Sequence, residues 1–200
     1  IHKNNKDVVY CGFNIIKNDT VVKVKTEFTE RDVLGKYISG KVRVPTTGWM
    51  VRSKLLYDLK FSENLSWGED HLFFYNVLGK TERIGFVNQY LTNYVDDDHS
   101  GRLSADSLDK INKDIRFISE AMSLETIKND QKHIRLLREY KLPGLIVYRL
   151  IRSLDESNID QIRMLYRQNY EYIKPISYVN GLRSIKLKIS NELLKRKIRM

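Results

Sequence analysis

Two adjacent carboxylates, Glu69 and Asp70, are the residues of this 200-residue chain best placed to do chemistry. They precede the apolar-rich run 72–78, which predicts a helix that begins close to the acidic pair. A carboxylate can act as a general base when it is held against the hydroxyl whose proton it removes. Acidic residues in the first turn also stabilise a helix by lying at its positive end. Taken alone, the pair favours this second, structural interpretation.

The residues around the pair form an ordered pattern. Upstream lie Thr-Gly-Trp-Met-Val-Arg at 47–52 and Leu-Lys-Phe-Ser-Glu-Asn-Leu at 59–65, and the pair itself belongs to Trp-Gly-Glu-Asp at 67–70. Downstream lie two short runs typical of strands, 83–87 and 90–95, followed by His-Ser-Gly-Arg-Leu-Ser at 99–104. No single part of this pattern is specific, so its order carries the information.

Over residues 7–107, about half of the chain, this pattern resembles the acceptor half of a family 2 glycosyltransferase with the GT-A fold. In that family an aromatic-bearing strand, a helix start similar to Arg-Ser-Lys-Leu-Leu and a Phe-x-x-x-Leu segment lead to a Gly-Glu-Asp box. The resemblance implies an inverting transfer of a sugar from a nucleotide-sugar donor to a glycan or lipid-linked acceptor. It also implies a setting in the synthesis of bacterial surface polysaccharides.

By this resemblance Asp70 is the catalytic base and Glu69 orients the acceptor or the base. Adjacent helical residues point about 100° apart, so the two carboxylates cannot fill one role. The resemblance further implies a divalent metal, Mg or Mn, that stabilises the leaving nucleoside diphosphate. With the flanking pattern included, the catalytic interpretation of the pair is favoured over the structural one.

Four more residues are candidates for the site, each with a structural alternative. By resemblance His99 is a metal ligand in a late loop, and Arg102 could bind the donor diphosphate through its planar fork of donors. Both could equally belong to a surface loop. Trp49 and Trp67 could form an acceptor-binding wall against a sugar ring, or could be core residues.

The triplet Asp96-Asp97-Asp98 matches the Asp-x-Asp motif with which the family holds metal and sugar nucleotide. In the family, however, that motif lies well upstream of Glu-Asp, whereas this triplet follows Asp70. We interpret it as a solvated turn.

The family's donor-binding half has no counterpart in the chain. Only seven residues precede Val8, which is too few for a nucleotide-binding βαβ unit. We therefore expect a fragment that lacks about 90 to 120 residues, a length estimated from usual domain size. The metal would be held largely by this missing half, and the isolated chain is expected to be inactive.

Composition excludes several other classes of protein. The chain is 42% hydrophobic and 30% charged, and no run approaches the ~20 apolar residues of a membrane-spanning helix. The single cysteine, Cys11, lies in a strand-like run and is interpreted as a small buried residue. The four histidines have no zinc-ligand spacing, and no nucleophile elbow, phosphate loop or dinucleotide motif occurs.

Hydrophobic periodicity predicts an α/β protein in two parts. Strands over 8–16 and 21–25 form a hairpin, and a short helix over 30–38 is capped by Thr29. Residues 1–107 form the acceptor-side part of the GT-A domain, and residues 108–200 form a helical, basic appendage. The appendage is expected to hold helices at the following positions: from about 104 to 122, 130–141, 145–154 after a break at Pro143-Gly144, from a cap at Ser157 to Pro175, and 182–199.

The net charge of +10 belongs almost entirely to the appendage. Residues 1–107 carry 15 Lys and Arg against 14 Asp and Glu, whereas residues 174–200 hold eight basic residues and the single acid Glu192. The last helix has one apolar stripe of Leu182, Ile185, Ile189 and Leu193 and a smaller one of Leu187, Leu194 and Ile198. Residues 176–200 could therefore lie peripherally on an anionic membrane, or pack on the appendage with a solvated basic face. We expect a cytoplasmic protein, with the inner face of the plasma membrane as the peripheral alternative.

Two rival functions stay open at this level. The chain could be a catalytically inert relative that serves as an assembly partner. It could also be a basic binding module for nucleic acid or a membrane surface. Nucleic acid is not expected, because no recognition motif and no interleaving of basic and aromatic residues occurs.

Overall fold

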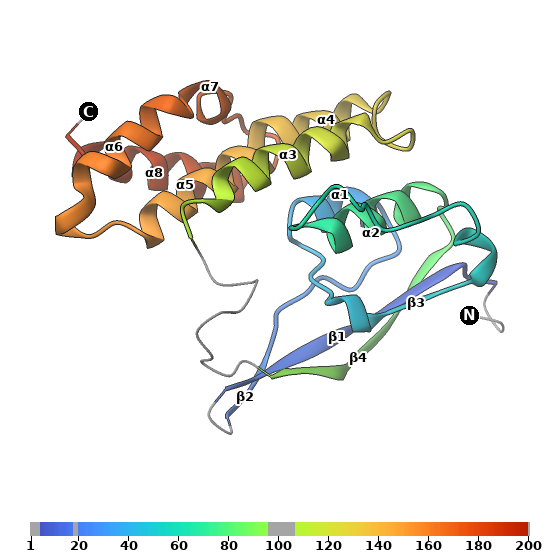
Figure 1. Ribbon diagram of the computed structural model, residues 1–200. Coiled ribbons are helices and arrows are strands. Elements are labelled where there is room, and N and C mark those ends of the chain that lie inside the picture. Colours follow the sequence, from blue (N-terminus) through green and yellow to red (C-terminus); the bar gives the residue numbers. More distant parts are fainter. Residues whose placement is uncertain (1–4, 18–19, 96–106, 200) are drawn as a thin grey trace. The chain divides into compact units, whose positions relative to one another are not determined.

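The computed structural model describes residues 5–17, 20–95 and 107–199 and divides the chain into two compact units (Figure 1). The first unit contains residues 1–64 and 69–102, and the second contains residues 65–68 and 103–200. The protein is mixed α/β, with the sheet in the first unit and helices in the second. The short segment 65–68, immediately before the acidic pair, belongs by its contacts to the second unit.

Strand β1 (Val8–Lys17) is the centre of a mixed sheet. One edge of β1 pairs in parallel with β4 (Ile84–Val95). The other edge pairs antiparallel with β3 (Trp49–Val51) at residues 8–10 and with β2 (Thr20–Lys23) at residues 14–17. The hairpin of β1 and β2 confirms the two strands predicted over 8–16 and 21–25. Side chains of β1 fill the core of this unit, among them the fully buried Val8 and Tyr10 and the buried Cys11.

The two downstream runs predicted as separate strands are one strand, β4. Its register with β1 shifts on both sides of Gly12, so that Cys11 faces Val87 and Gly12 faces Tyr90. A bulge of this kind accommodates extra residues without ending the strand. A Cβ atom at Gly12 would lie 2.9 Å from the Tyr90 ring, so glycine allows the close approach. The polar residues between the runs therefore mark a bulge and not a loop.

A buried carboxylate joins the strand ends. Asp7, directly before β1, is 3% exposed and lies 2.7 Å from Nη2 of Arg83 and 3.3 Å from Nζ of Lys54. Thr81 donates a 3.0 Å hydrogen bond to it, and Arg52 lies beside it. Burial alone would raise the pKa of Asp7, but the hydrogen bonds from Arg83 and Thr81 outweigh burial and lower that pKa. Asp7 thus fixes the starts of β1 and β4 against the end of β3.

In the described residues of this unit, a short α-helix, two 3-10 turns and a longer α-helix accompany the sheet. Helix α1 (Val33–Ile38) starts later than the predicted 30–38, and Asp32 precedes it in the left-handed conformation. Thr29 does not cap it: its hydroxyl accepts a hydrogen bond from the Arg31 amide within the preceding turn. The 3-10 turns η1 (Thr46–Gly48) and η2 (Ser53–Leu55) flank β3, and helix α2 covers Glu69–Gly79.

The second unit is helical. Helix α3 (Lys110–Ser123) is followed by α4 (Gln131–Leu136), the π-helical turn η3 (Leu137–Lys141) and α5 (Leu142–Arg152). The predicted break at Pro143-Gly144 is wrong. Pro143 lies in the first turn of α5, where a missing amide proton and a fixed φ are tolerated, and the wider turn η3 connects α4 to α5.

The chain then forms η4 (Glu156–Asn158), α6 (Ile159–Gln168), α7 (Tyr170–Ile173) and α8 (Leu182–Lys197). The cap before α6 is built on Asp155 and not on Ser157. The Asp155 carboxylate accepts hydrogen bonds from both the amide and the hydroxyl of Ser157. Helix α5 is central to the unit and contacts α3, α7 and α8. Among the described residues, no helix has the length and apolar character needed to cross a bilayer.

Candidate functional site

Glu69 and Asp70 form the first turn of α2, and both are partly exposed. The two oxygens of Asp70 accept different hydrogen bonds. Oδ1 accepts one from the backbone amide of His71 at 2.7 Å, and Oδ2 accepts one from the Thr46 hydroxyl at 3.2 Å. These bonds fix the plane of the carboxylate. Because a carboxylate has about four lone-pair positions, Asp70 can still accept a proton from a further partner.

Thr46 is placed by the tight turn η1. Gly48 at the end of this turn is buried, and a Cβ atom there would lie 2.7 Å from Cγ1 of Val44. The next residue, Trp49, begins β3 and pairs with Tyr10 of β1. The hydroxyl that binds Asp70 is therefore attached to the central sheet through a turn that only glycine fits.

A cluster of aromatic residues lies beside Asp70. The buried rings of Tyr37 in α1 and Tyr75 in α2 meet edge to face, with centroids 5.7 Å apart. Burial raises the pKa of Tyr37 well above its usual range, and Tyr75 and Asp70 raise that pKa further. Burial also raises the pKa of Tyr75, and Asp70 again contributes. Both phenols are therefore protonated at neutral pH and lie in the field of the Asp70 carboxylate.

Trp49 belongs to the same cluster. Its ring stacks on Phe74 at 5.1 Å between centroids and meets Tyr37 edge to face at 5.3 Å. The residue is partly exposed, but its indole Nε1 is buried. The structure thus brings Asp70 and Trp49 together around Tyr37, and Glu69 is the neighbour of Asp70 in the first turn of α2.

Trp67 has its contacts in the second unit. Its indole Nε1 donates a 2.8 Å hydrogen bond to Asp114 of α3. The Lys110 ammonium lies 4.3 Å above the ring, and the Arg149 guanidinium lies 5.4 Å from the ring centre. Arg149 also binds Asp114 through two nitrogens, one of them at 3.1 Å. Trp67 is therefore held in a polar network within the second unit, and an acceptor wall shared with Trp49 stays a prediction.

Gly68 has a physical role between Trp67 and the acidic pair. Its φ of +79° lies in the left-handed region, and a Cβ atom would lie 2.8 Å from the Phe117 ring. Both facts require glycine at this position. The Trp-Gly-Glu-Asp sequence therefore combines an anchor, a turn and a helix start in four residues.

Sequence reasoning missed three residues of this arrangement, Asp114, Arg149 and Thr46. For Asp114 a signal was available. It lies between Ile111 and Ile118 on the apolar face of α3, and a charged residue on a buried face needs a partner. Thr46 carried no such signal, because its role depends on a turn that packs against a distant helix.

The remaining predicted residues lie outside the described part of the chain. His99, Arg102 and the triplet 96–98 belong to the undescribed segment 96–106, so their predictions stay untested. Among the described residues, no three His, Cys, Asp or Glu side chains gather where they could hold a metal ion. The described carboxylates around Asp70 thus offer no ligand set of their own for the expected Mg or Mn.

A scan of the chain against protein-family models and a search of curated proteins each returned no match.

Proposed function

We propose that this chain is the acceptor side of an inverting glycosyltransferase with the GT-A fold, with Asp70 as the base. The ordered pattern over residues 7–107 supports the family, and a mixed α/β unit around that pattern is compatible with it. The observation that carries the proposal is the fixed orientation and partial exposure of the Asp70 carboxylate. Its carboxylate is oriented by Thr46 and the His71 amide, remains partly exposed and begins a helix.

In the proposed reaction Asp70 removes the proton of an acceptor hydroxyl while that oxygen attacks the anomeric carbon of the donor sugar. The bond between the sugar and the nucleoside diphosphate breaks, and the diphosphate leaves with the bonding electrons. A carboxylate is a weak base in water, so its fixed position against the hydroxyl supplies much of the effect. Glu69, on the same helical turn but about 100° around the axis, would orient the acceptor or the base.

The nucleotide sugar and its divalent metal would be bound mainly by a part of the protein beyond this chain. When bound, Mg or Mn neutralises charge on the departing diphosphate. His99 is proposed as a ligand of that metal, and Arg102 as a ligand of the donor diphosphate. The acceptor is proposed to be a glycan or a lipid-linked sugar on the cytoplasmic side of the membrane, with Trp49 and Trp67 as ring contacts.

The test uses the protein that carries this chain, a panel of UDP-, GDP- and dTDP-sugars, and release of nucleoside diphosphate in the presence of acceptor. The Asp70→Asn variant is expected to lose transfer by about a hundredfold or more, because removal of a general base costs on this scale. Donor binding, measured by calorimetry, is expected to stay unchanged.

Glu63→Gln provides the matched control, because Glu63 is an exposed carboxylate of the same unit. It is expected to retain full transfer. Undiminished transfer by Asp70→Asn would exclude this residue as the base. A folded wild-type protein that uses no donor in the panel, and binds none, would contradict the glycosyltransferase proposal itself.

A further inference from the structure

Helix α8 is apolar on two opposite sides, and the structure buries only one of them. The side with Leu187, Leu194 and Ile198 packs into the second unit, and these side chains are at most 1% exposed. At about 100° per residue, the longer stripe lies on the opposite side of the helix. All four of its residues are exposed, most of all Leu182 at 84%: Leu182, Ile185, Ile189 and Leu193.

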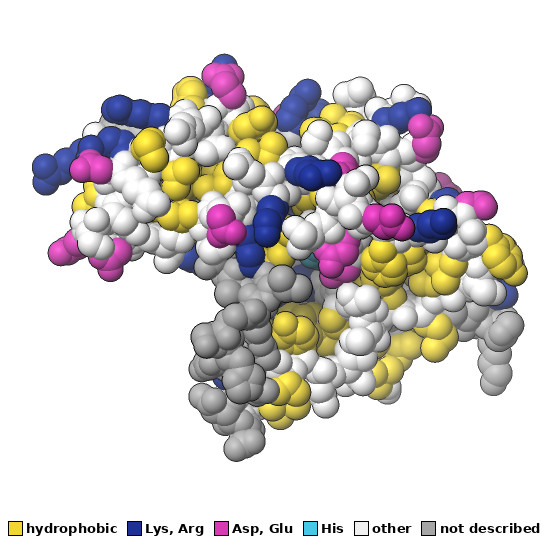
Figure 2. All heavy atoms as spheres, viewed as in Figure 1, with side chains coloured by type: hydrophobic (Ala, Val, Ile, Leu, Met, Phe, Trp, Pro, Cys, Tyr) yellow, Lys and Arg dark blue, Asp and Glu magenta, His cyan; other side chains and the backbone are white. Residues whose placement is uncertain are grey.

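Basic residues surround this outward stripe. Lys186, Arg196 and Lys197 are exposed and lie on the same outward half of the helix. The only acid between residues 174 and 200, Glu192, is paired with Lys195 at 2.8 Å. Figure 2 shows Lys, Arg and apolar side chains, with Asp and Glu among them, over the end of the unit that carries the C-terminus. The outward side of α8 thus combines large aliphatic groups with a positive border.

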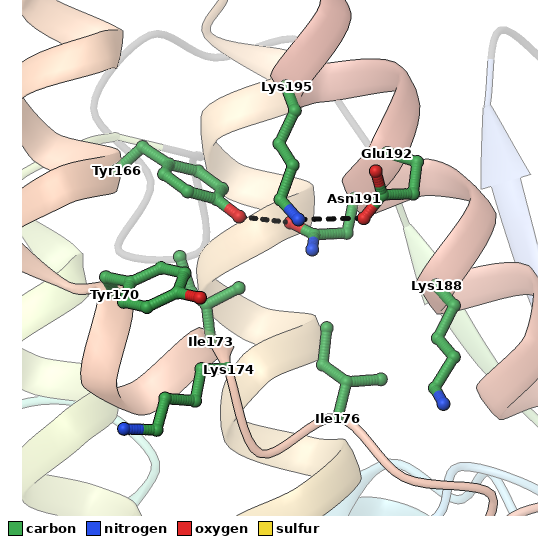
Figure 3. A pocket seen from close by; sticks show the side chains of 9 residues that line it. All are labelled: Tyr166, Tyr170, Ile173, Lys174, Ile176, Lys188, Asn191, Glu192 and Lys195. Atoms are coloured by element: carbon green, nitrogen blue, oxygen red, sulfur yellow. Dashed lines mark hydrogen bonds and ion pairs between the residues drawn. The ribbon is translucent and has the colours of Figure 1, made fainter. Parts of the chain in front are cut away.

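The other flank of α8 is basic as well. It borders a hollow of about 290 Å³ that lies between α8 and the segment around α7 (Figure 3). Lys188 and Lys195 reach this hollow from α8, and Lys174 reaches it from the end of α7. Glu192, the partner of Lys195, also lines it. The Lys188 ammonium lies 3.6 Å from the centre of the Tyr178 ring. Both flanks of the aliphatic stripe therefore present ammonium or guanidinium groups.

We propose that the outward side of α8 docks on an anionic lipid bilayer, with Leu182, Ile185, Ile189 and Leu193 inserted at the boundary between head groups and acyl chains. A helix of this composition lies in the plane of the interface. Acidic head groups attract the flanking Lys and Arg, whose long side chains reach the head-group level while their methylenes cover apolar surface.

Charge decides between a membrane and a second copy of the chain as the occupant. Two copies joined through this stripe would bring Lys186, Arg196 and Lys197 of each copy close to those of the other. Such like charges oppose association. A bilayer that contains acidic lipids offers the complementary charge and the apolar interior together. The proposal does not rest on glycosyl transfer, so each can fail without the other.

The experiment measures co-sedimentation of the protein with vesicles of phosphatidylcholine alone and of phosphatidylcholine with 30% phosphatidylglycerol. The wild-type protein is expected to bind the anionic vesicles at least about tenfold more tightly than the neutral ones, because each basic residue near the surface adds to the attraction. Binding is expected to weaken as salt is raised from 0.1 to 0.5 M.

Two variants separate the aliphatic and the charged contributions. Replacing the stripe (Leu182→Ser, Ile185→Ser, Ile189→Ser, Leu193→Ser) and replacing the border (Lys186→Gln, Arg196→Gln, Lys197→Gln) are each expected to weaken binding about tenfold or more. The matched control removes three charges from exposed positions on α3, α4 and the loop between them (Arg116→Gln, Lys128→Gln, Lys132→Gln) and is expected to bind as the wild type does. Circular dichroism checks that each variant keeps its helices.

Insertion is measured directly with Ile189→Trp and brominated phospholipids, after subtraction of the wild-type fluorescence. Quenching of the added tryptophan is expected in anionic vesicles. Equal binding by the stripe variant and the wild type would overturn the proposal. It would also be overturned by a wild-type dimer in analytical ultracentrifugation that the stripe variant loses, without vesicle binding by either protein.

Discussion

The indole nitrogen of Trp67 donates a 2.8 Å hydrogen bond to Asp114, whose carboxylate is fully buried and also bound by Arg149. Trp67 lies two residues before Glu69 in the sequence, whereas Asp114 is 47 residues further along the chain. The motif that resembles a glycosyltransferase box is therefore anchored by residues that lie outside it. This anchor explains why a tryptophan stands at position 67 without requiring that it touch a substrate.

Replacing Asp114 should destabilise the second unit strongly. In Asp114→Asn the Arg149 guanidinium, 4% exposed, would lose its charged partner inside the protein. Breaking a buried ion pair from one side costs about 3 to 5 kcal/mol. We expect a fall of this size in the free energy of unfolding, measured by urea denaturation with helical circular dichroism as the signal.

The double variant Asp114→Leu with Arg149→Met should be more stable than Asp114→Asn, since it leaves no uncompensated charge. The exposed pair of Arg116 and Glu120, 3.4 Å apart, provides the control. Glu120→Gln is expected to change the free energy of unfolding by less than about 1 kcal/mol. A similar loss in both single variants would contradict the role of Asp114.

Gly68→Ala should lower the free energy of unfolding by more than the backbone conformation of this position alone predicts. The left-handed conformation destabilises the folded state by about 1 to 2 kcal/mol when the residue has a side chain. At Gly68 the new methyl group would also meet Phe117 at 2.8 Å. A fall in the free energy of unfolding of no more than about 1 to 2 kcal/mol, measured by urea denaturation, would show that Phe117 tolerates the added group.

Glu139 should make the stability of the second unit depend on acidic pH. Hydrogen bonds from Arg135, at 3.0 and 3.2 Å, lower the pKa of Glu139 from 4.5 to about 2 in spite of burial, and Ser177 and Arg138 add to this. A carboxyl group whose folded pKa is depressed stabilises the protein above its unfolded pKa and loses this contribution as pH falls through the folded value.

The difference in unfolding free energy between wild type and Glu139→Gln should therefore be constant above about pH 5.5 and shrink between pH 4.5 and 2. Urea titrations at several pH values measure this difference. Glu125→Gln, which removes an exposed carboxylate that pairs with Lys128, should show a much smaller change across the same range. A pH-independent difference for Glu139→Gln would mean that its hydrogen bonds, and not its charge, are what matters.

Thr46 should act on the proposed reaction through Asp70. Thr46→Val keeps the shape of the side chain and removes the hydroxyl that donates to Oδ2. A hydrogen bond of this kind contributes on the order of 1 kcal/mol, or about fivefold in rate. We expect kcat to fall by this factor with little change in KM for the acceptor. Thr46→Ser retains the hydroxyl and should restore the rate, whereas a purely structural role would not be rescued.

Much of the local structure could be predicted from the sequence because it depends on neighbouring residues. Strand-like runs joined by polar turn residues predicted the hairpin of β1 and β2. The 3-4 spacing predicted α8 and α3, although α3 begins at Lys110 and not near residue 104. The predictions were wrong where other parts of the structure determine the local conformation. The bulge at Gly12 depends on Tyr90, and the continuation through Pro143 depends on a π-helical turn.

The acidic pair at 69–70 and the two apolar stripes of residues 182–198 were determined by the sequence alone, because residue type and helical period suffice to define them. Tertiary structure decided which partners they have. It gave Asp70 the Thr46 hydroxyl, gave Trp67 the Asp114 carboxylate, and buried one stripe of α8 while it left the other exposed. The physical reason is that a side chain's neighbours come from segments far apart along the chain, and only the packing of the whole unit selects them.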